Sequence, residues 1–251
     1  MNFVQLPDNW PTQRETLRRI VAHVVAQAQA SVTGHFALMP LPGGFGTPQF
    51  GPNRQRVRLS GGSMFVETAA AQRDDQTVAS TEVHMLAGST IRQLCAAAGF
   101  EPDPDFKAGN DTPPSGDIDE VLILDSDATT LVGDWFQLGQ RAMDMALASL
   151  PDPQASIVRL WPEHFDTGLD LAVDNSSKPG RRTNLGAAAG DDFHQEPYLY
   201  VGPWGPERPG PTEFWNASFG ATLSFGDLDA AENPLATAAE FFLHGIAYQR
   251  S

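Results

Sequence analysis

Apolar residues recur at helical spacing near the start of the chain. Between residues 12 and 31 they lie on one side of a helix, at Leu17, Ile20, Val21, Val24, Val25 and Ala28. This pattern predicts a helix over 12–31, with a capping box formed by Thr12 and Glu15. His23 is expected at the helix surface or boundary, with Arg14, Arg18 and Gln29 facing water.

The same spacing predicts further helices over 127–150 and 235–248, and a short helix over 89–98 that ends at Gly99. In the helix over 127–150, Gly133 and Gly139 indicate close packing against another backbone. Cys95 is the only cysteine in the chain and falls on the apolar side of the short helix. We therefore expect a buried structural thiol at this position and no disulfide.

Alternating apolar and polar residues predict strands in the remaining sequence. Residues 57–60 and 63–67 flank Gly61 and Gly62, a pair that suits the tight turn of a hairpin. Further strands are predicted over 155–161, 168–173, 198–202 and 217–225. The sequence therefore predicts an α+β fold, a mainly antiparallel β-sheet with three or four helices packed on it.

Two segments rich in proline and glycine interrupt this pattern. Residues 40–52 are expected to form an ordered loop with Phe45 and Phe50 buried, either a structural loop or a lid over a substrate. Residues 101–119 are the candidate for an internal boundary. At 251 residues the chain is long enough to bury a large core, and we expect residues 1–251 to be a single co-folded unit.

The formal net charge of −15 limits the possible partners. A net negative field repels phosphate, which argues against nucleic acid and against anionic membranes. The first residues lack a secretory signal pattern, and no stretch approaches the ~20 apolar residues of a membrane span. The sequence therefore predicts a cytoplasmic protein with no membrane partner.

Histidines and acids concentrate in two short stretches, residues 161–166 (WPEHFD) and 191–200 (DDFHQEPYLY). In extended backbone, residues i and i+2 point to the same side, so His164 would pair with Asp166, and His194 would line up with Asp192 and Glu196. Two imidazoles and a carboxylate suit zinc, iron or manganese.

The predicted metal ligands are His164, His194 and Glu196. Asp166 and Asp192 are the candidate catalytic residues, as general bases or as partners that orient an imidazole. In the alternative interpretation, each histidine ends a strand and binds a neighbouring acid or carbonyl. The metal hypothesis requires the two distant imidazoles to lie close together.

Aromatic residues in the same region suggest a ligand site. The candidates are Trp161, Tyr198, Tyr200, Trp204, Trp215 and Asn216. Such side chains stack on planar ligands while a polar edge makes hydrogen bonds, although core packing is the alternative. Alternation sends Tyr198 and Tyr200 to one face of their strand and Leu199 to the other.

Several motifs resemble a family of actinobacterial proteins of similar length. They lie at 160–166, 184–186, 190–191, 196–204 and 214–217, and in the loop at 42–48. The resemblance implies a cytosolic bacterial origin and a single co-folded unit, and it carries no activity, cofactor or catalytic residue.

Three classes of function fit these observations. The first is a metal-assisted enzyme that acts on a small molecule in a pocket of histidines, acids and aromatic residues. The second is a small-molecule-binding protein that uses the same pocket without catalysis. The third is an interaction or assembly protein that uses an acidic, aromatic surface.

Overall fold

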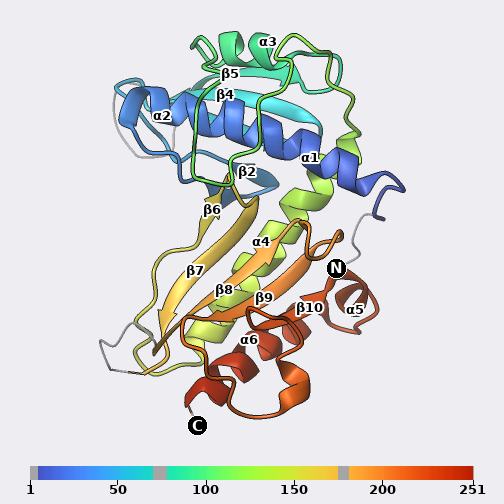
Figure 1. Ribbon diagram of the computed structural model, residues 1–251. Coiled ribbons are helices and arrows are strands. Elements are labelled where there is room, and N and C mark those ends of the chain that lie inside the picture. Colours follow the sequence, from blue (N-terminus) through green and yellow to red (C-terminus); the bar gives the residue numbers. More distant parts are fainter. Residues whose placement is uncertain (1–4, 70–77, 175–180, 251) are drawn as a thin grey trace. The chain divides into compact units, whose positions relative to one another are not determined.

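The computed structural model describes residues 5–69, 78–174 and 181–250 of the chain (Figure 1). These residues form two antiparallel five-stranded sheets and five helices, with α1 and α2 counted as one continuous stretch, which confirms the predicted α+β fold. They divide into two compact units. The N-terminal unit contains residues 5–134 and 160–165, and the C-terminal unit contains residues 135–159 and 166–250.

The N-terminal unit begins with one long helical stretch. It consists of α1 (Trp10–Ile20), a π-helical turn η1 (Val21–Ala26) and α2 (Gln27–Thr33). Its apolar side is fully buried at Leu17, Ile20, Val21, Val24 and Val25, as the spacing predicts. The predicted capping box is wrong, because the helix begins before Thr12, with Asn9 as N-cap and a proline in its first turn.

The first sheet is a simple meander in the order β1-β2-β3-β4-β5. Its strands are β1 (Met39–Leu41), β2 (Gly44–Gly46), β3 (Arg56–Ser60), β4 (Ser63–Ala69) and β5 (Val78–Met85). The predicted hairpin is confirmed, with Gly61 and Gly62 at φ values of 54° and 76°. The segment 40–52 contains two short strands that were not predicted, and Phe45 and Phe50 are buried in it as expected.

A short helix, α3 (Ile91–Ala97), packs against η1. Thr90 caps its start in a capping box with Gln93, and Gly99 follows its end with φ 88°. Cys95 is buried in this helix, and burial raises the pKa of its thiol to about 12. The thiol therefore stays protonated and structural, as predicted.

The stretch 101–119 lies inside the N-terminal unit and runs along the long helix. Side chains of that helix hold it by donating hydrogen bonds to backbone carbonyls. Arg18 donates to the Asp111 carbonyl, and Arg19 donates to the Ser115 carbonyl. His23 donates to the Pro113 carbonyl, and Gln27 donates to the Asp103 carbonyl. Arg14 and Gln29 are expected to face water, and His23 to lie at the helix surface or boundary. These expectations are wrong, since all three side chains are buried.

Helix α4 (Ser126–Ala148) continues from one unit into the other at Asp134 and Trp135. Its two glycines pack closely, as predicted. A Cβ added at Gly133 would lie 3.0 Å from the Cα of Gly44, and one added at Gly139 would lie 2.5 Å from the Cβ of Ala187. Both positions therefore exclude a larger side chain.

The second sheet has the order β10-β9-β8-β7-β6, and its strands β7 to β10 belong to the C-terminal unit. The strands are β6 (Arg159–Trp161), β7 (Asp166–Ala172), β8 (Arg182–Ala188), β9 (Tyr198–Pro203) and β10 (Ala221–Ser224). A 3-10 turn, η3 (Thr212–Phe214), and two helices, α5 (Phe225–Asp229) and α6 (Pro234–Arg250), complete the unit. Strand β8 was not predicted.

Helices pack on one face of this second sheet. Gly245 of α6 lies against the Val201 side chain, Gln249 donates to the Thr183 hydroxyl, and Gly139 of α4 lies against Ala187. By strand alternation, the opposite face carries the even-numbered residues of β7, β8 and β9. Within the described ranges, no helix has both the length and the apolar character that crossing a membrane requires.

Candidate functional site

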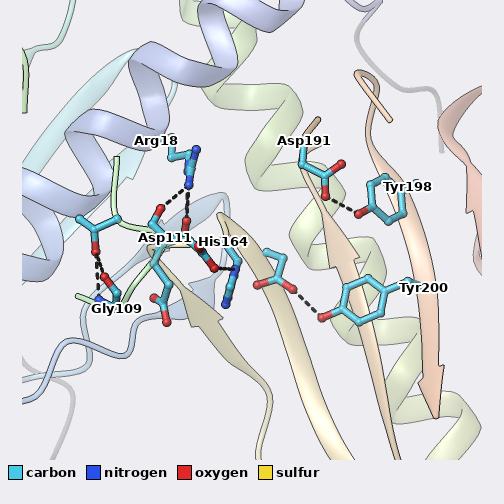
Figure 2. Close-up of polar contacts among 10 residues, drawn as sticks. Arg18, Gly109, Asp111, His164, Asp191, Tyr198 and Tyr200 are labelled. Atoms are coloured by element: carbon cyan, nitrogen blue, oxygen red, sulfur yellow. Dashed lines mark hydrogen bonds and ion pairs between the residues drawn. The ribbon is translucent and has the colours of Figure 1, made fainter. Parts of the chain in front are cut away.

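Acidic and aromatic side chains gather at one end of the face of the second sheet that is opposite the helices. We call this group the aromatic–carboxylate cluster. It consists of Asp166, Asp191, Phe193, Tyr198, Tyr200 and Phe219. Figure 2 shows Tyr198 directed at Asp191, and Tyr200 directed at a second carboxylate, that of Asp166.

Two glycines allow Tyr200 to lie flat across the sheet. Tyr200 of β9 is opposite Gly186 of β8, which is in turn opposite Gly168 of β7. A Cβ at Gly186 would overlap the tyrosine ring and hydroxyl, and one at Gly168 would lie 3.0 Å from that hydroxyl. The ring thus spans the middle strand, and its hydroxyl donates to Asp166 Oδ2 at 2.5 Å.

A tight turn at 191–194 positions the second carboxylate. Asp191 Oδ1 accepts hydrogen bonds from the backbone amides of Phe193 (2.8 Å) and His194 (3.0 Å), an Asx turn. Asp191 Oδ2 accepts from the Tyr198 hydroxyl at 2.6 Å. Three donors therefore fix the position of this carboxylate.

The rings of the cluster pack edge to face. Phe193 contacts Phe219 at a centroid separation of 5.1 Å and Tyr198 at 6.0 Å, and Tyr200 contacts Phe219 at 6.5 Å. Tyr198 is buried, whereas Phe193 is 51% exposed and Phe219 is 36% exposed. Two ordered phenylalanine rings therefore present apolar surface to solvent beside fixed carboxylates.

Burial and the nearby charge change the acid–base properties of the tyrosine. Burial, followed by repulsion from the Asp166 charge and the hydrogen bond to it, raises the pKa of Tyr200 well above its usual value of 10.0. The phenol therefore remains a hydrogen-bond donor across the physiological range. His194 packs edge to face on Tyr198 at 5.8 Å, and its buried Nε2 has no hydrogen-bond partner among the described residues.

A second set of polar contacts lies around Glu163 in the N-terminal unit, and Figure 2 shows part of it at Arg18, Gly109 and Asp111. Arg18 donates to the backbone carbonyls of Glu163 and Asp111, and Thr112 closes the turn at Gly109. The Glu163 side chain packs on Gly109, where an added Cβ would lie 2.9 Å from the carboxylate Oε1. Its Oε2 is buried with no hydrogen-bond partner in the described part of the chain, and burial raises the pKa of this carboxyl.

The extended backbone assumed for the two histidine stretches is wrong. Residues 162–165 form a turn with Phe165 at φ 55°, and residues 191–194 form the Asx turn. The i, i+2 alternation therefore does not apply to either histidine. His164 instead faces Asp111, with 3.6 Å between Nδ1 and Oδ2 in an exposed pair.

The predicted metal ligands belong to different units, with His164 in the N-terminal unit and His194 and Glu196 in the C-terminal unit. In the described ranges, no group of three or more histidine, cysteine, aspartate or glutamate side chains is arranged to hold a metal ion. Ligation by His164, His194 and Glu196 stays a prediction. Of the two candidate catalytic acids, Asp166 lies in the cluster and Asp192 is exposed on the turn.

The predicted ligand-binding aromatics do not all lie together. Tyr198 and Tyr200 are in the cluster, but Trp204 donates to Asn184, which lies about 13 Å along β8 from the position opposite Tyr198. Trp215 donates to the Pro209 carbonyl, and Asn216 makes two backbone hydrogen bonds to Thr222. Trp161 is half-buried at the end of β6, and this residue belongs to the N-terminal unit.

Sequence reasoning missed the two exposed rings and the two glycines of the cluster. Phe193 is an apolar residue between an acid and a histidine in a turn, a signal that could have marked it. Phe219 precedes Gly220 in the turn before β10, and nothing local connects it to Tyr200. The role of Gly168 and Gly186 can be recognised only once the strand register is known.

Comparisons with protein-family models, with curated proteins and with solved structures give no match for this chain. The resemblance to actinobacterial proteins stays a prediction. The chemistry of the cluster therefore follows from its own side chains. Exposed rings can stack on an apolar or planar group, while charged carboxylates and phenol hydroxyls can pair with polar groups of the same molecule.

Proposed function

We propose that this chain is a small-molecule-binding protein whose ligand occupies the aromatic–carboxylate cluster. One observation carries the proposal: Phe193 and Phe219 stay exposed although they belong to a rigid network of rings and hydrogen bonds. Exposed aromatic surface costs free energy unless something covers it, and ordered polar groups beside it provide orientation.

Preorganisation of the cluster supports binding. The hydroxyls of Tyr198 and Tyr200 are each fixed by a carboxylate, and the Asp191 turn fixes Phe193 by a hydrogen bond to its amide. A ligand that binds here orders few side chains, so little conformational entropy is lost. This arrangement fits recognition, since both tyrosine hydroxyls are already held by carboxylates.

The test is a ligand screen on matched variants. A panel of small molecules of positive, neutral and negative charge is added to the wild-type protein, to Phe193→Ala and to Ile157→Ala, and the melting temperature is measured. Ile157 is an exposed apolar residue of the same unit, 70% exposed, and serves as the control. A ligand selective for the native state raises the melting temperature of the wild type and control but not of Phe193→Ala.

The metal-assisted enzyme is the second candidate, favoured by the buried, unpartnered Nε2 of His194 in the described structure. Elemental analysis of protein purified without added metal tests it independently. Stoichiometric zinc, iron or manganese that is lost in the His164→Ala, His194→Ala double variant would support this candidate. Metal-free protein that binds a ligand would support the binding function alone.

A further inference from the structure

We infer that the ligand of the aromatic–carboxylate cluster is a small organic cation, with an alkylammonium or guanidinium group seated against Phe193 and Phe219. This inference rests on the proposed function and adds the chemical class of the ligand. It depends on three observations: the charge of the turn, the polarisation of the tyrosine rings, and the fixed position of the carboxylate beside the exposed rings.

The turn that carries Phe193 is strongly acidic. Residues 191–196 contain Asp191, Asp192 and Glu196 and no lysine or arginine. Asp192 and Glu196 are exposed, and neither makes an ion pair among the described residues. The local negative field attracts cations and repels anions, and the net charge of the chain acts in the same direction.

The rings of the cluster are suited to a cation. An aromatic face carries partial negative charge and attracts ammonium and guanidinium groups within about 6 Å of its centre. Tyr198 and Tyr200 donate their hydroxyl protons to carboxylates, which increases the electron density of both rings. On the same face of the sheet, the Arg182 guanidinium lies over the Trp204 ring at 5.7 Å, so this surface already seats one cation on an aromatic ring.

The Asp191 carboxylate provides a counter-charge that does not need to be reorganised. Its two oxygens accept from two backbone amides and one phenol, and it is half-exposed next to the exposed Phe193 ring. A cation over that ring gains both the ring interaction and the carboxylate attraction. A neutral ligand of the same shape gains the apolar contact alone.

A matched pair of probes tests the charge of the ligand. The first is benzyltrimethylammonium, and the second is its neutral isostere, in which a tert-butyl group replaces the trimethylammonium group. Binding is followed by NMR chemical-shift changes at low and high salt. We expect the cation to bind about tenfold more tightly than the isostere, with the difference shrinking as salt screens the carboxylates.

Variants assign the effect to the cluster. Asp191→Asn keeps the acceptor for the backbone amides but removes the charge, so it should weaken cation binding about fivefold and leave the isostere unchanged. Asp144→Asn, an exposed carboxylate of α4 in the same unit, removes the same charge elsewhere and should change neither. Phe193→Ala should weaken both probes, and circular dichroism of each variant establishes that it is folded.

The outcomes separate the two proposals. Equal affinity for the two probes, both lost in Phe193→Ala, would overturn the cation assignment and leave the binding function standing. Binding of anionic panel members in preference to both probes would also overturn it. No Phe193-dependent binding of either probe or of any member of the screening panel would overturn the binding function together with this inference.

Discussion

At the scale of single residues, the key position of the C-terminal unit is Gly186, which has no side chain where Tyr200 needs space. The ring crosses β8 at this glycine and reaches Asp166 on β7 beyond it. One contact therefore connects three strands on the face that carries the aromatic–carboxylate cluster. The site therefore requires glycine at position 186 as well as tyrosine at position 200.

Gly186→Ala is expected to lower the free energy of unfolding by about 2–3 kcal/mol. Its Cβ would overlap the Tyr200 ring and would lie 2.5 Å from the backbone oxygen of Thr167, which cannot move without disturbing β7. Urea denaturation measures the change. Gly202→Ala is the control: its Cβ would meet only Asn184 at 3.9 Å, so a change within about 0.5 kcal/mol is expected. Equal effects at both glycines would contradict the packing argument.

Tyr200→Phe removes the hydroxyl that Asp166 accepts, and we expect it to cost about 1–2 kcal/mol. The raised pKa of Tyr200 also gives a pH signature. The native state holds this proton more tightly than the unfolded state, so stability falls as the pH rises above the usual tyrosine value of 10.0. In an absorbance titration, the wild type should show a late tyrosine ionisation that Tyr200→Phe lacks.

Glu163 is a buried carboxyl whose ionisation is unfavourable. Burial raises its pKa above the usual 4.5, so its contribution to stability is fully present below pH 4.5 and is lost as the pH rises through the folded value. Glu163→Gln should therefore raise the free energy of unfolding near neutral pH, by on the order of 1 kcal/mol, and make little difference below pH 4.5. A variant that is less stable than the wild type at neutral pH would show that the carboxylate has a compensating partner.

The sequence predicted part of the cluster at this scale. Alternation placed Tyr198 and Tyr200 on one face correctly, because a period of two holds throughout β9. Alternation could not predict that their hydroxyls bind Asp191 and Asp166. The Asx turn at Asp191 and the positive φ of Phe165 end the extended backbone just where alternation was applied to the histidines.

At the scale of secondary-structure elements, the long helix of the N-terminal unit acts as a support for the stretch 101–119. Positions 18, 19, 23 and 27 lie on one side of the helix and donate to four backbone carbonyls of that stretch. A proline- and glycine-rich segment with few backbone hydrogen bonds of its own is thereby fixed. Of these four side chains, His23 is the one that gains a charge on acidification.

Acidification should weaken the attachment at His23. Its Nε2 donates to the Pro113 carbonyl, and burial lowers its pKa from the usual 6.5. The unfolded state therefore binds a proton more readily, so this contribution to stability is present above pH 6.5 and is lost as the pH falls toward the folded value. His23→Gln keeps a donor for Pro113 and should flatten the change in stability measured between about pH 7.5 and pH 5.5.

His35→Gln is the matched control, because His35 is an exposed histidine of the same unit. It should reproduce the wild-type pH dependence. If His23→Gln retains the full pH dependence, the acid sensitivity arises from other groups.

Element prediction succeeded where packing and local pattern agree. The helices over 12–31, 89–98, 127–150 and 235–248 all exist, with ends shifted by a few residues. Strand β8 was missed because its sequence, RTNLGAA, has small residues where strands usually carry branched or aromatic ones. Those small residues accept Tyr200 on one face and α4 on the other, requirements that appear only in three dimensions.

At the scale of the whole molecule, neither compact unit is a continuous piece of chain. The chain passes between them at 134/135, at 159/160 and at 165/166. The six residues 160–165 belong to the N-terminal unit although 25 residues of the other unit precede them. The expected single co-folded unit stays a prediction.

The segment 160–165 makes contacts that the rest of the N-terminal unit cannot replace. Leu160 and Leu38 exchange two backbone hydrogen bonds of 2.9 Å, and the fully buried Phe165 ring contacts Phe45 at 6.0 Å. The backbone carbonyl of Glu163 accepts two hydrogen bonds from Arg18. Loss of a buried aromatic residue alone costs about 3–5 kcal/mol, a large part of the stability of a small domain.

We therefore expect a fragment of residues 1–134 to be largely unfolded, whereas the full chain unfolds in one cooperative transition. Adding a synthetic peptide of residues 158–167 should restore a cooperative transition and near-ultraviolet circular dichroism to the fragment, since binding to the native form shifts the equilibrium. The same peptide with Phe165→Ala should restore neither at equal concentration. A fragment that unfolds cooperatively without the peptide, at the denaturant midpoint of the full chain, would show that the N-terminal unit is an independent domain.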